Sequence, residues 1–212
     1  SLTANSTGTR NTGAGAFTLA GNTTASDNTA FGYQVLEANT TGASNTAVGT
    51  YALDANTTAD NNTAVGYSSL GVNTTGTGNV AVGALALDAN TTASSNTAIG
   101  SESLTGNTTG TLNVGVGARA LRLNTTANSN TAVGYKAMDV NTTGASNVAI
   151  GSEALDANTT GATNIAVGAG ALGANTTASN NTAVGYASLG ANITGANNVG
   201  VGTNALQANT SG

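Results

Sequence analysis

Apolar and polar residues alternate along the chain in a pattern that repeats every 17 residues. Each unit opens with Asn, and this Asn recurs without insertion or deletion from Asn11 to Asn198. The consensus is N-(T/V)-A-(V/I)-G-x-x-(A/S)-L-x-x-N-T-T-(G/A)-x-x. We number the positions of the unit 1 to 17 from this Asn. Bulky apolar residues are fixed at positions 4 and 9, and Gly, Asn and small residues separate them.

Three further features show that the repeat is strict. Gly occupies position 5 in every unit from Gly15 to Gly202, and Asn occupies position 12 throughout. Leu occupies position 9 in every unit but one, where Met138 replaces it. Residues 1–10 fit the same register, so the repeat covers the whole chain. We therefore expect one continuous array over residues 1–212 with no second domain.

A period of 17 residues excludes most repeat architectures. Helical solenoid repeats need about 33 to 47 residues, and Gly and Asn are poor helix formers. Collagen requires Gly at every third residue, which this chain lacks. We therefore predict an all-β fold, a parallel β-solenoid (β-roll) of about 12.5 coils with 17 residues in each coil. Strands about 4.8 Å apart would make a rod roughly 60 Å long.

Each fixed position has an expected role in such a coil. Val or Ile at position 4 and Leu at position 9 should form the spine of a thin core. Gly at position 5 suits a corner with positive φ or a close backbone approach. Asn at positions 1 and 12 should form ladders in which each amide bonds the amide one coil away. The residues predicted to form these columns include Asn28, Asn45, Asn62, Asn39, Asn56, Asn73, Gly32, Gly49, Gly66, Val48, Val65, Leu36, Leu53 and Leu70.

A second period of two coils lies within the first. Position 15 largely alternates between Ala and Gly, and the four Tyr at position 6 all fall in units that follow an Ala. Duplication of a two-coil ancestor would explain this alternation. Alternatively, Tyr needs room on every second coil for packing or for binding a ligand. The candidate surface contacts are Tyr33, Tyr67, Tyr135 and Tyr186.

The N-(T/V)-A-(V/I)-G motif, followed by a small residue and regularly spaced Gly, resembles the repeats of YadA-type heads of trimeric autotransporter adhesins. It is equally similar to repeat arrays of bacteriophage tail fibres. The resemblance extends over all 212 residues. It implies a left-handed parallel β-roll that is commonly trimeric and works as a surface-exposed adhesive or spacer rod. The adhesin repeat is shorter, so the coil here should have a larger cross-section.

The composition argues against enzymatic and nucleic-acid-binding functions. The chain has no Cys, His, Trp or Pro, so we expect no catalytic site, no metal site and no cofactor. Its net charge of −5 disfavours nucleic acid, and no apolar run is long enough to span a membrane.

Acidic residues recur at position 10, where we favour a solvated edge over a calcium site. The recurring Asn-Thr-Thr is formally a glycosylation acceptor but is better explained by the repeat.

Three functions remain open, all extracellular, on a cell surface or on a virion fibre. The favoured one is a structural fibre or shaft whose subunits associate laterally, end to end, or both. Position 3 and position 4 give each strand two apolar faces, of which one is free for a partner. Both ends of the chain carry the consensus without a cap, so we expect either a piece of a longer array or ends that meet other subunits head to tail. The partner would be the chain itself, including as a homotrimer. The alternatives are an adhesin that binds host-surface glycans and an ice-binding protein with Asn and the second Thr on one face.

Overall fold

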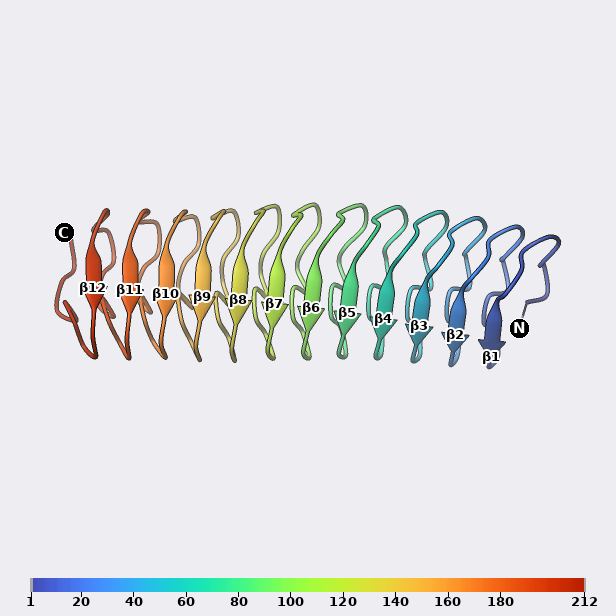
Figure 1. The fold of residues 1–212 in the computed structure, drawn as a ribbon, viewed down its shortest axis with the longest axis horizontal. Helices are drawn as coiled ribbons and strands as arrows, with labels where there is room; N and C mark the ends of the chain where they lie inside the picture. The colour runs from blue at the N-terminus through green and yellow to red at the C-terminus, as the bar shows by residue number, and fades with distance from the viewer. Residues whose placement is uncertain (1, 212) are drawn as a thin grey trace.

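Twelve short strands lie side by side in one parallel sheet, and each occupies the same place in its coil (Figure 1). The computed structural model describes residues 2–211, which contain no helix. The strands are β1 (Thr12–Ala14), β2 (Thr29–Phe31), β3 (Thr46–Val48), β4 (Thr63–Val65), β5 (Val80–Val82), β6 (Thr97–Ile99), β7 (Val114–Val116), β8 (Thr131–Val133), β9 (Val148–Ile150), β10 (Ile165–Val167), β11 (Thr182–Val184) and β12 (Val199–Val201). The predicted all-β parallel solenoid with 17 residues in each coil is confirmed.

The strict period follows from the register of the sheet. Every strand pairs with the next one residue for residue, so that position 2 faces position 2 and position 4 faces position 4. Thr63, for example, lies beside Val80 in this ladder. An inserted residue would move every following side chain out of its column.

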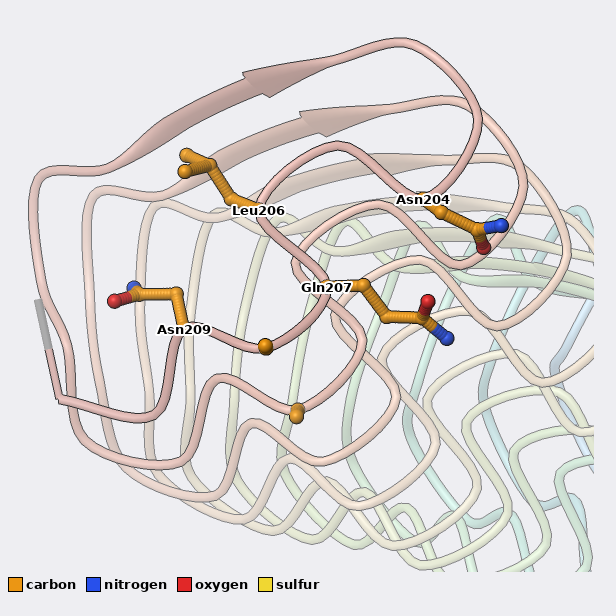
Figure 2. A pocket seen from close by; sticks show the side chains of 6 residues that line it. Asn204, Leu206, Gln207 and Asn209 are labelled. Carbon is orange, nitrogen blue, oxygen red and sulfur yellow. The ribbon is translucent and has the colours of Figure 1, made fainter.

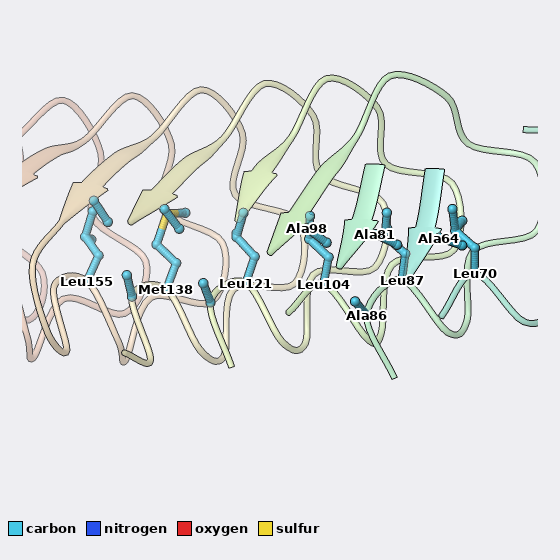
Figure 3. Close-up of a cluster of buried hydrophobic side chains, with 14 of the residues drawn as sticks. Ala64, Leu70, Ala81, Ala86, Leu87, Ala98, Leu104, Leu121, Met138 and Leu155 are labelled. Atoms are coloured by element: carbon cyan, nitrogen blue, oxygen red, sulfur yellow. The ribbon is translucent and has the colours of Figure 1, made fainter. Parts of the chain in front are cut away.

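The hydrophobic core is built from Leu at position 9 and small residues at positions 3 and 8 (Figure 3). Leu70, Leu87 and Leu104 are completely buried, as is Met138 in the unit that lacks Leu. Ala at position 3 fills the space between the strands and the Leu column. The predicted burial of Leu36, Leu53 and Leu70 is therefore confirmed.

The predicted burial of the position 4 residues is wrong. Val48 and Val65 do stack in a ladder, but on the outside of the coil, where Val48 is 36% exposed. Successive strand residues point to opposite faces, and Ala at position 3 points inward. Positions 2 and 4 must therefore point outward. The Leu column already fills the narrow interior, so that only Ala fits opposite it.

The remaining part of the interior is polar. Asn side chains at positions 1 and 12 are buried along the stack, as Asn45 and Asn56 illustrate. The cross-section of each coil thus has a hydrocarbon half and an amide half. Such an interior is stable only if every amide is hydrogen-bonded.

Tight turns close the coil. Gly at position 5 has φ between 122° and 140°, and a Cβ built on Gly66 would lie 2.5 Å from the carbonyl oxygen of Gly83. The predicted glycine corner at Gly32, Gly49 and Gly66 is therefore confirmed. Positions 7, 9 and 17 are also left-handed, with φ between 49° and 64° even where the residue is not Gly. This conformation costs about 1 kcal/mol per residue, which the hydrogen bonds between coils must offset.

Candidate functional site

The outward side chains of the sheet form one long flat surface, which we call the outer sheet face. It consists of positions 2 and 4 of all twelve coils. Position 2 is Thr, Val or Ile in every coil, and position 4 is Val or Ile in every coil from Val48 to Val201. The face carries no charged residue, although Ile99 and Ile150 are 40% and 42% exposed. Its β-branched side chains have few rotamers, so the surface is rigid as well as apolar.

The Asn column at position 12 forms the predicted amide ladder. The Nδ2 atom of Asn39 donates to Oδ1 of Asn22 at 3.0 Å, and Asn56 donates to Asn39 at 2.9 Å. Asn73 continues the ladder to Asn56 at 3.2 Å. From Asn5 to Asn192, the Nδ2 atom also donates to the carbonyl oxygen of position 15 in its own coil, as from Asn56 to Ala59 at 3.1 Å.

The Asn column at position 1 mainly bonds the backbone instead, which corrects the prediction. The side-chain oxygen of Asn45 accepts the backbone N–H of Asn62 at 2.9 Å. The Nδ2 atom of Asn62 donates to the carbonyl oxygen of Gly76, also at 2.9 Å. A direct amide contact occurs between Asn45 and Asn28 at 3.2 Å. These side chains hold the turn that precedes the strand, because they bond both of its ends.

The two Thr that follow position 12 differ in their contacts. The hydroxyl of Thr40, at position 13, donates to the carbonyl oxygen of Thr57 at 3.0 Å, and most coils repeat this bond. Thr at position 14 is exposed in every coil, so it cannot share a face with the buried Asn at position 12. The predicted ice-binding array of Asn and the second Thr is therefore wrong. The Asn-Thr-Thr acceptors also have their amides buried and bonded, which leaves no free nitrogen for a glycan.

The two-coil alternation has a structural basis at position 16. Where a coil with Gly at position 15 is followed by a coil with Ala there, the backbone N–H of position 16 donates to a side chain of the following coil. Ala43 donates to Asp60 at 2.7 Å, and Thr111 donates to Asn128 at 2.7 Å. Ser26, Ser94 and Ser179 accept in the same way at 3.0 Å. Every acceptor follows an Ala at position 15, so pairs of coils form one hydrogen-bonded unit.

Four aromatic rings in the first coils form a continuous ridge, which we call the aromatic ladder. It consists of Phe17, Tyr33, Tyr51 and Tyr67. The rings meet edge to face, with centroids 5.9, 5.8 and 6.1 Å apart. They alternate between positions 7 and 6 on successive coils. Sequence reasoning selected Tyr33 and Tyr67 but missed Phe17 and Tyr51, because it considered position 6 alone.

The other two predicted Tyr contacts lie apart from this ladder. The ring of Tyr135 faces the Nζ atom of Lys136 at 5.2 Å from its centroid. Tyr186 is 63% exposed. The structure therefore brings together two of the four predicted Tyr.

Charged side chains gather at positions 7 and 10, which lie on the same side of the coil as the aromatic ladder. Side chains at position 7 reach position 10 of the following coil, as Ser68 reaches Asp88 at 2.8 Å. Arg119 reaches Asp139 in the same way at 3.3 Å, and Arg122 bonds the same carboxylate at 2.7 Å. Within residues 2–211, no group of three or more acidic, His or Cys side chains could hold a metal ion.

Burial changes the ionisation of two carboxyl groups at position 10. It raises the pKa of Asp54, and the charges of Glu37 and Asp88 act in the same direction. Burial likewise raises the pKa of Asp156, with Glu153 and Asp139 nearby. At position 17, by contrast, the hydrogen bond from Arg10 lowers the pKa of Asp27. Asp54 and Asp156 are thus carboxylates that the fold does not neutralise.

One hollow lies on the last described coil (Figure 2). Its lining residues are Ala191, Asn204, Leu206, Gln207, Ala208 and Asn209. Leu206 is 52% exposed there, whereas the other residues of its column from Leu19 to Leu189 are buried. The hollow is thus the open cross-section of the stack rather than a pocket built into a coil wall.

Comparisons of the chain with protein-family models, curated proteins and solved structures found no match. Over residues 2–211, no helix is long and apolar enough to cross a membrane.

Proposed function

We propose that the protein is a structural shaft, exposed on a cell surface or virion, whose copies associate laterally through the outer sheet face. The observation that carries this proposal is the continuous apolar face without a single charge along twelve strands. Exposed apolar patches of this extent are typical of interaction surfaces. The proposal extends the resemblance to adhesin heads and tail fibres, in which chains pack side by side.

The dimensions of the face suit a second copy. Twelve strands at a spacing of about 4.8 Å make it about 55 Å long, and two columns make it roughly 10 Å wide. Two such faces would bury on the order of 1,200 Å² in total, at the lower end of specific interfaces. A partner with the same spacing of coils can match the face along its entire length. An identical chain has this spacing because its coils are the same.

The composition of the two columns suggests how the copies would pack. Val and Ile at position 4 would lie at the centre of the interface, where apolar side chains are best buried. Thr at position 2, such as Thr63 and Thr97, would lie at the rim. Both residues are partly exposed, so at the rim their hydroxyls keep their access to water. Burying them fully would cost about 1–3 kcal/mol each.

Charge substitutions on the outer sheet face test the proposal. We expect the full chain to form an oligomer in analytical ultracentrifugation, and the double variant Val82→Lys/Val116→Lys to be monomeric, with association at least about 100-fold weaker. The matched control is Thr92→Lys/Thr126→Lys, which adds the same charge with the same two-coil spacing at exposed position 14. The control should associate like the unmodified chain. Circular dichroism would show that all three proteins are folded.

Two results would contradict lateral association. One is an unmodified chain that stays monomeric at about 0.1 mM, and the other is equal association of the two double variants. A monomeric rod that inhibits ice recrystallisation, and loses this activity in the Val variant, would show that ice rather than a second copy occupies the face. End-to-end assembly stays a separate prediction, which electron microscopy of the assembled material tests.

A further inference from the structure

The aromatic ladder is a second exposed surface, and the fold does not require it. Phe17, Tyr33 and Tyr67 are 54%, 41% and 53% exposed, so burial in the core does not explain their size. In the other coils these two positions carry Ala, Ser, Thr, Asn, Gly, Leu or charged residues, and Tyr135 and Tyr186 each occur without an aromatic neighbour. Within residues 2–211, the ladder is therefore the region where aromatic rings occupy successive coils. Since Gly at position 5 separates it from the strands, it lies around the corner from the outer sheet face.

Two carboxylates, Glu37 and Asp54, accompany the ladder in its two middle coils. The side chain of Gln34, at position 7, donates to the carboxylate of Glu37, at position 10 of the same coil, at 2.6 Å. Tyr51 and Asp54 occupy the same two positions of the next coil. Phe17 and Glu37 occupy position 7 and position 10 of successive coils, the positions through which Ser68 contacts Asp88. Neither Glu37 nor Asp54 takes part in an ion pair within residues 2–211. The rings are thus flanked by negative charge that no basic side chain neutralises.

The region of the chain that contains the ladder is also the more negatively charged one. Residues 11–118 contain six acidic residues and no Lys or Arg, whereas residues 119–212 contain three of each sign. Arg10 precedes this region and pairs with Asp27 at the opposite end of the strand. A ligand that approaches the ladder therefore meets a negative potential, which attracts cations and slows anions.

Aromatic faces and carboxylates together recognise organic cations. The negative face of a ring attracts an ammonium or guanidinium group within about 6 Å. The chain itself contains an example, because the Nζ atom of Lys136 lies 5.2 Å from the ring centroid of Tyr135. In the ladder, no Lys or Arg occupies that place. The site is open to a cation from outside.

We propose that the aromatic ladder, with Glu37 and Asp54, binds a ligand that carries several ammonium or guanidinium groups. The successive rings, about 6 Å apart, would engage successive cationic groups of an extended ligand. A Lys- or Arg-bearing peptide and a linear polyamine share this chemistry. The proposal does not depend on lateral association, since it concerns a different side of the coil.

Isothermal titration calorimetry of the full chain tests the site with two probes, a ten-residue peptide of alternating Arg and Gly and the polyamine spermine. We expect Tyr51→Ala and Asp54→Asn each to weaken binding by about five- to tenfold. Tyr186→Ala removes an exposed Tyr outside the ladder, and Asp156→Asn removes a carboxylate of position 10 without an aromatic neighbour at position 7. These two controls should change affinity by less than about twofold. Binding of the peptide alone would assign the site to a polypeptide, and binding of both probes would assign it to the cationic groups themselves.

Three outcomes would overturn the proposal. The first is no binding of either probe at about 1 mM. The second is an equal loss of affinity in the ladder variants and the controls, which would show that binding depends only on the general negative charge of the rod. The third is a neutral oligosaccharide that binds with the same dependence on Tyr51, which would make the ladder a sugar site. Because Asp54→Asn changes no ring, a loss of affinity in this variant cannot be attributed to disruption of the ladder.

Discussion

Asn is the residue on which the polar half of each coil depends, because one amide can donate and accept at once. Asn56 donates to both Asn39 and Ala59 while its oxygen accepts from Asn73. Asp would lose the donors, and Leu would leave the carbonyl of Ala59 without this bond. An unsatisfied buried group costs about 1–3 kcal/mol. The requirement for two donors and an acceptor in one small side chain explains why no other residue replaces Asn.

At the same scale, Asp156 is expected to destabilise the fold at neutral pH. Its folded-state pKa is raised above the ordinary 3.8, chiefly by burial. The folded state therefore binds the proton more tightly, and the free energy of unfolding falls as pH rises through the raised pKa. Asp156→Asn should increase the free energy of unfolding at pH 7 by less than about 1 kcal/mol, because the partly exposed group is screened by solvent. Denaturant unfolding measures the difference.

The same variant should have almost no effect at about pH 3, below the ordinary pKa of Asp. There the carboxyl group is protonated in both the folded and the unfolded state, so that its ionisation no longer contributes. An equal gain at both pH values would show that the amide acts by packing or hydrogen bonding and not by removing a charge.

The structural element of this protein is a pair of coils rather than a single coil. The donated N–H at position 16 and its side-chain acceptor belong to successive coils, as Thr111 and Asn128 do. The pairing fails where two Gly coils follow one another, because Ala162 offers Ala145 no acceptor. Local hydrogen bonding thus accounts for the alternation without any requirement from the Tyr residues.

Gly at position 15 is required by the close approach of the following coil rather than by its own φ. A Cβ on Gly110 would lie 2.3 Å from the carbonyl oxygen of Ala127 and 2.5 Å from Oδ1 of Asn107. Gly110→Ala should therefore lower the free energy of unfolding by about 1–3 kcal/mol, as overpacking does. Thermal unfolding followed by circular dichroism measures the loss.

Gly173→Ala is the matched control for this substitution. The added Cβ would come no closer than 3.2 Å to another atom, the carbonyl oxygen of Gly170. Since Ala also restricts the unfolded chain, the change should be small in either direction. If both variants lost the same stability, the close approach at position 15 would not be the cause.

On the scale of the whole molecule, each coil contacts only its neighbours, so stability grows with the number of interfaces between coils. Within residues 2–211, the buried apolar residues form a column along the rod, to which successive coils contribute. The outer sheet face and the aromatic ladder lie on different sides of the coil. The rod can therefore associate laterally and bind a ligand with independent surfaces.

Deletions test this organisation. Removal of residues 79–112, which are two complete coils, keeps the alternation at position 15 and should leave a folded rod with a slightly lower melting temperature. Removal of Ala145 alone should destabilise the protein far more, although it is a single residue, because it shifts one coil against the next. Thermal unfolding compares the two. Greater loss from the 34-residue deletion would contradict the nearest-neighbour description.

The sequence by itself determined the period, the parallel stacking and the roles of Gly at position 5, Leu at position 9 and Asn at position 12. These follow because each column repeats one physical requirement twelve times, and a local pattern is enough to read it.

Only the tertiary structure decided which strand face is buried. Val48 is bulkier than Ala47, yet Ala47 lies inside, because the interior has room for one Leu column. Contacts between neighbouring coils, such as Phe17 with Tyr33 or Ala43 with Asp60, also depend on the exact path of the turns. Side-chain bulk and spacing alone do not specify that path.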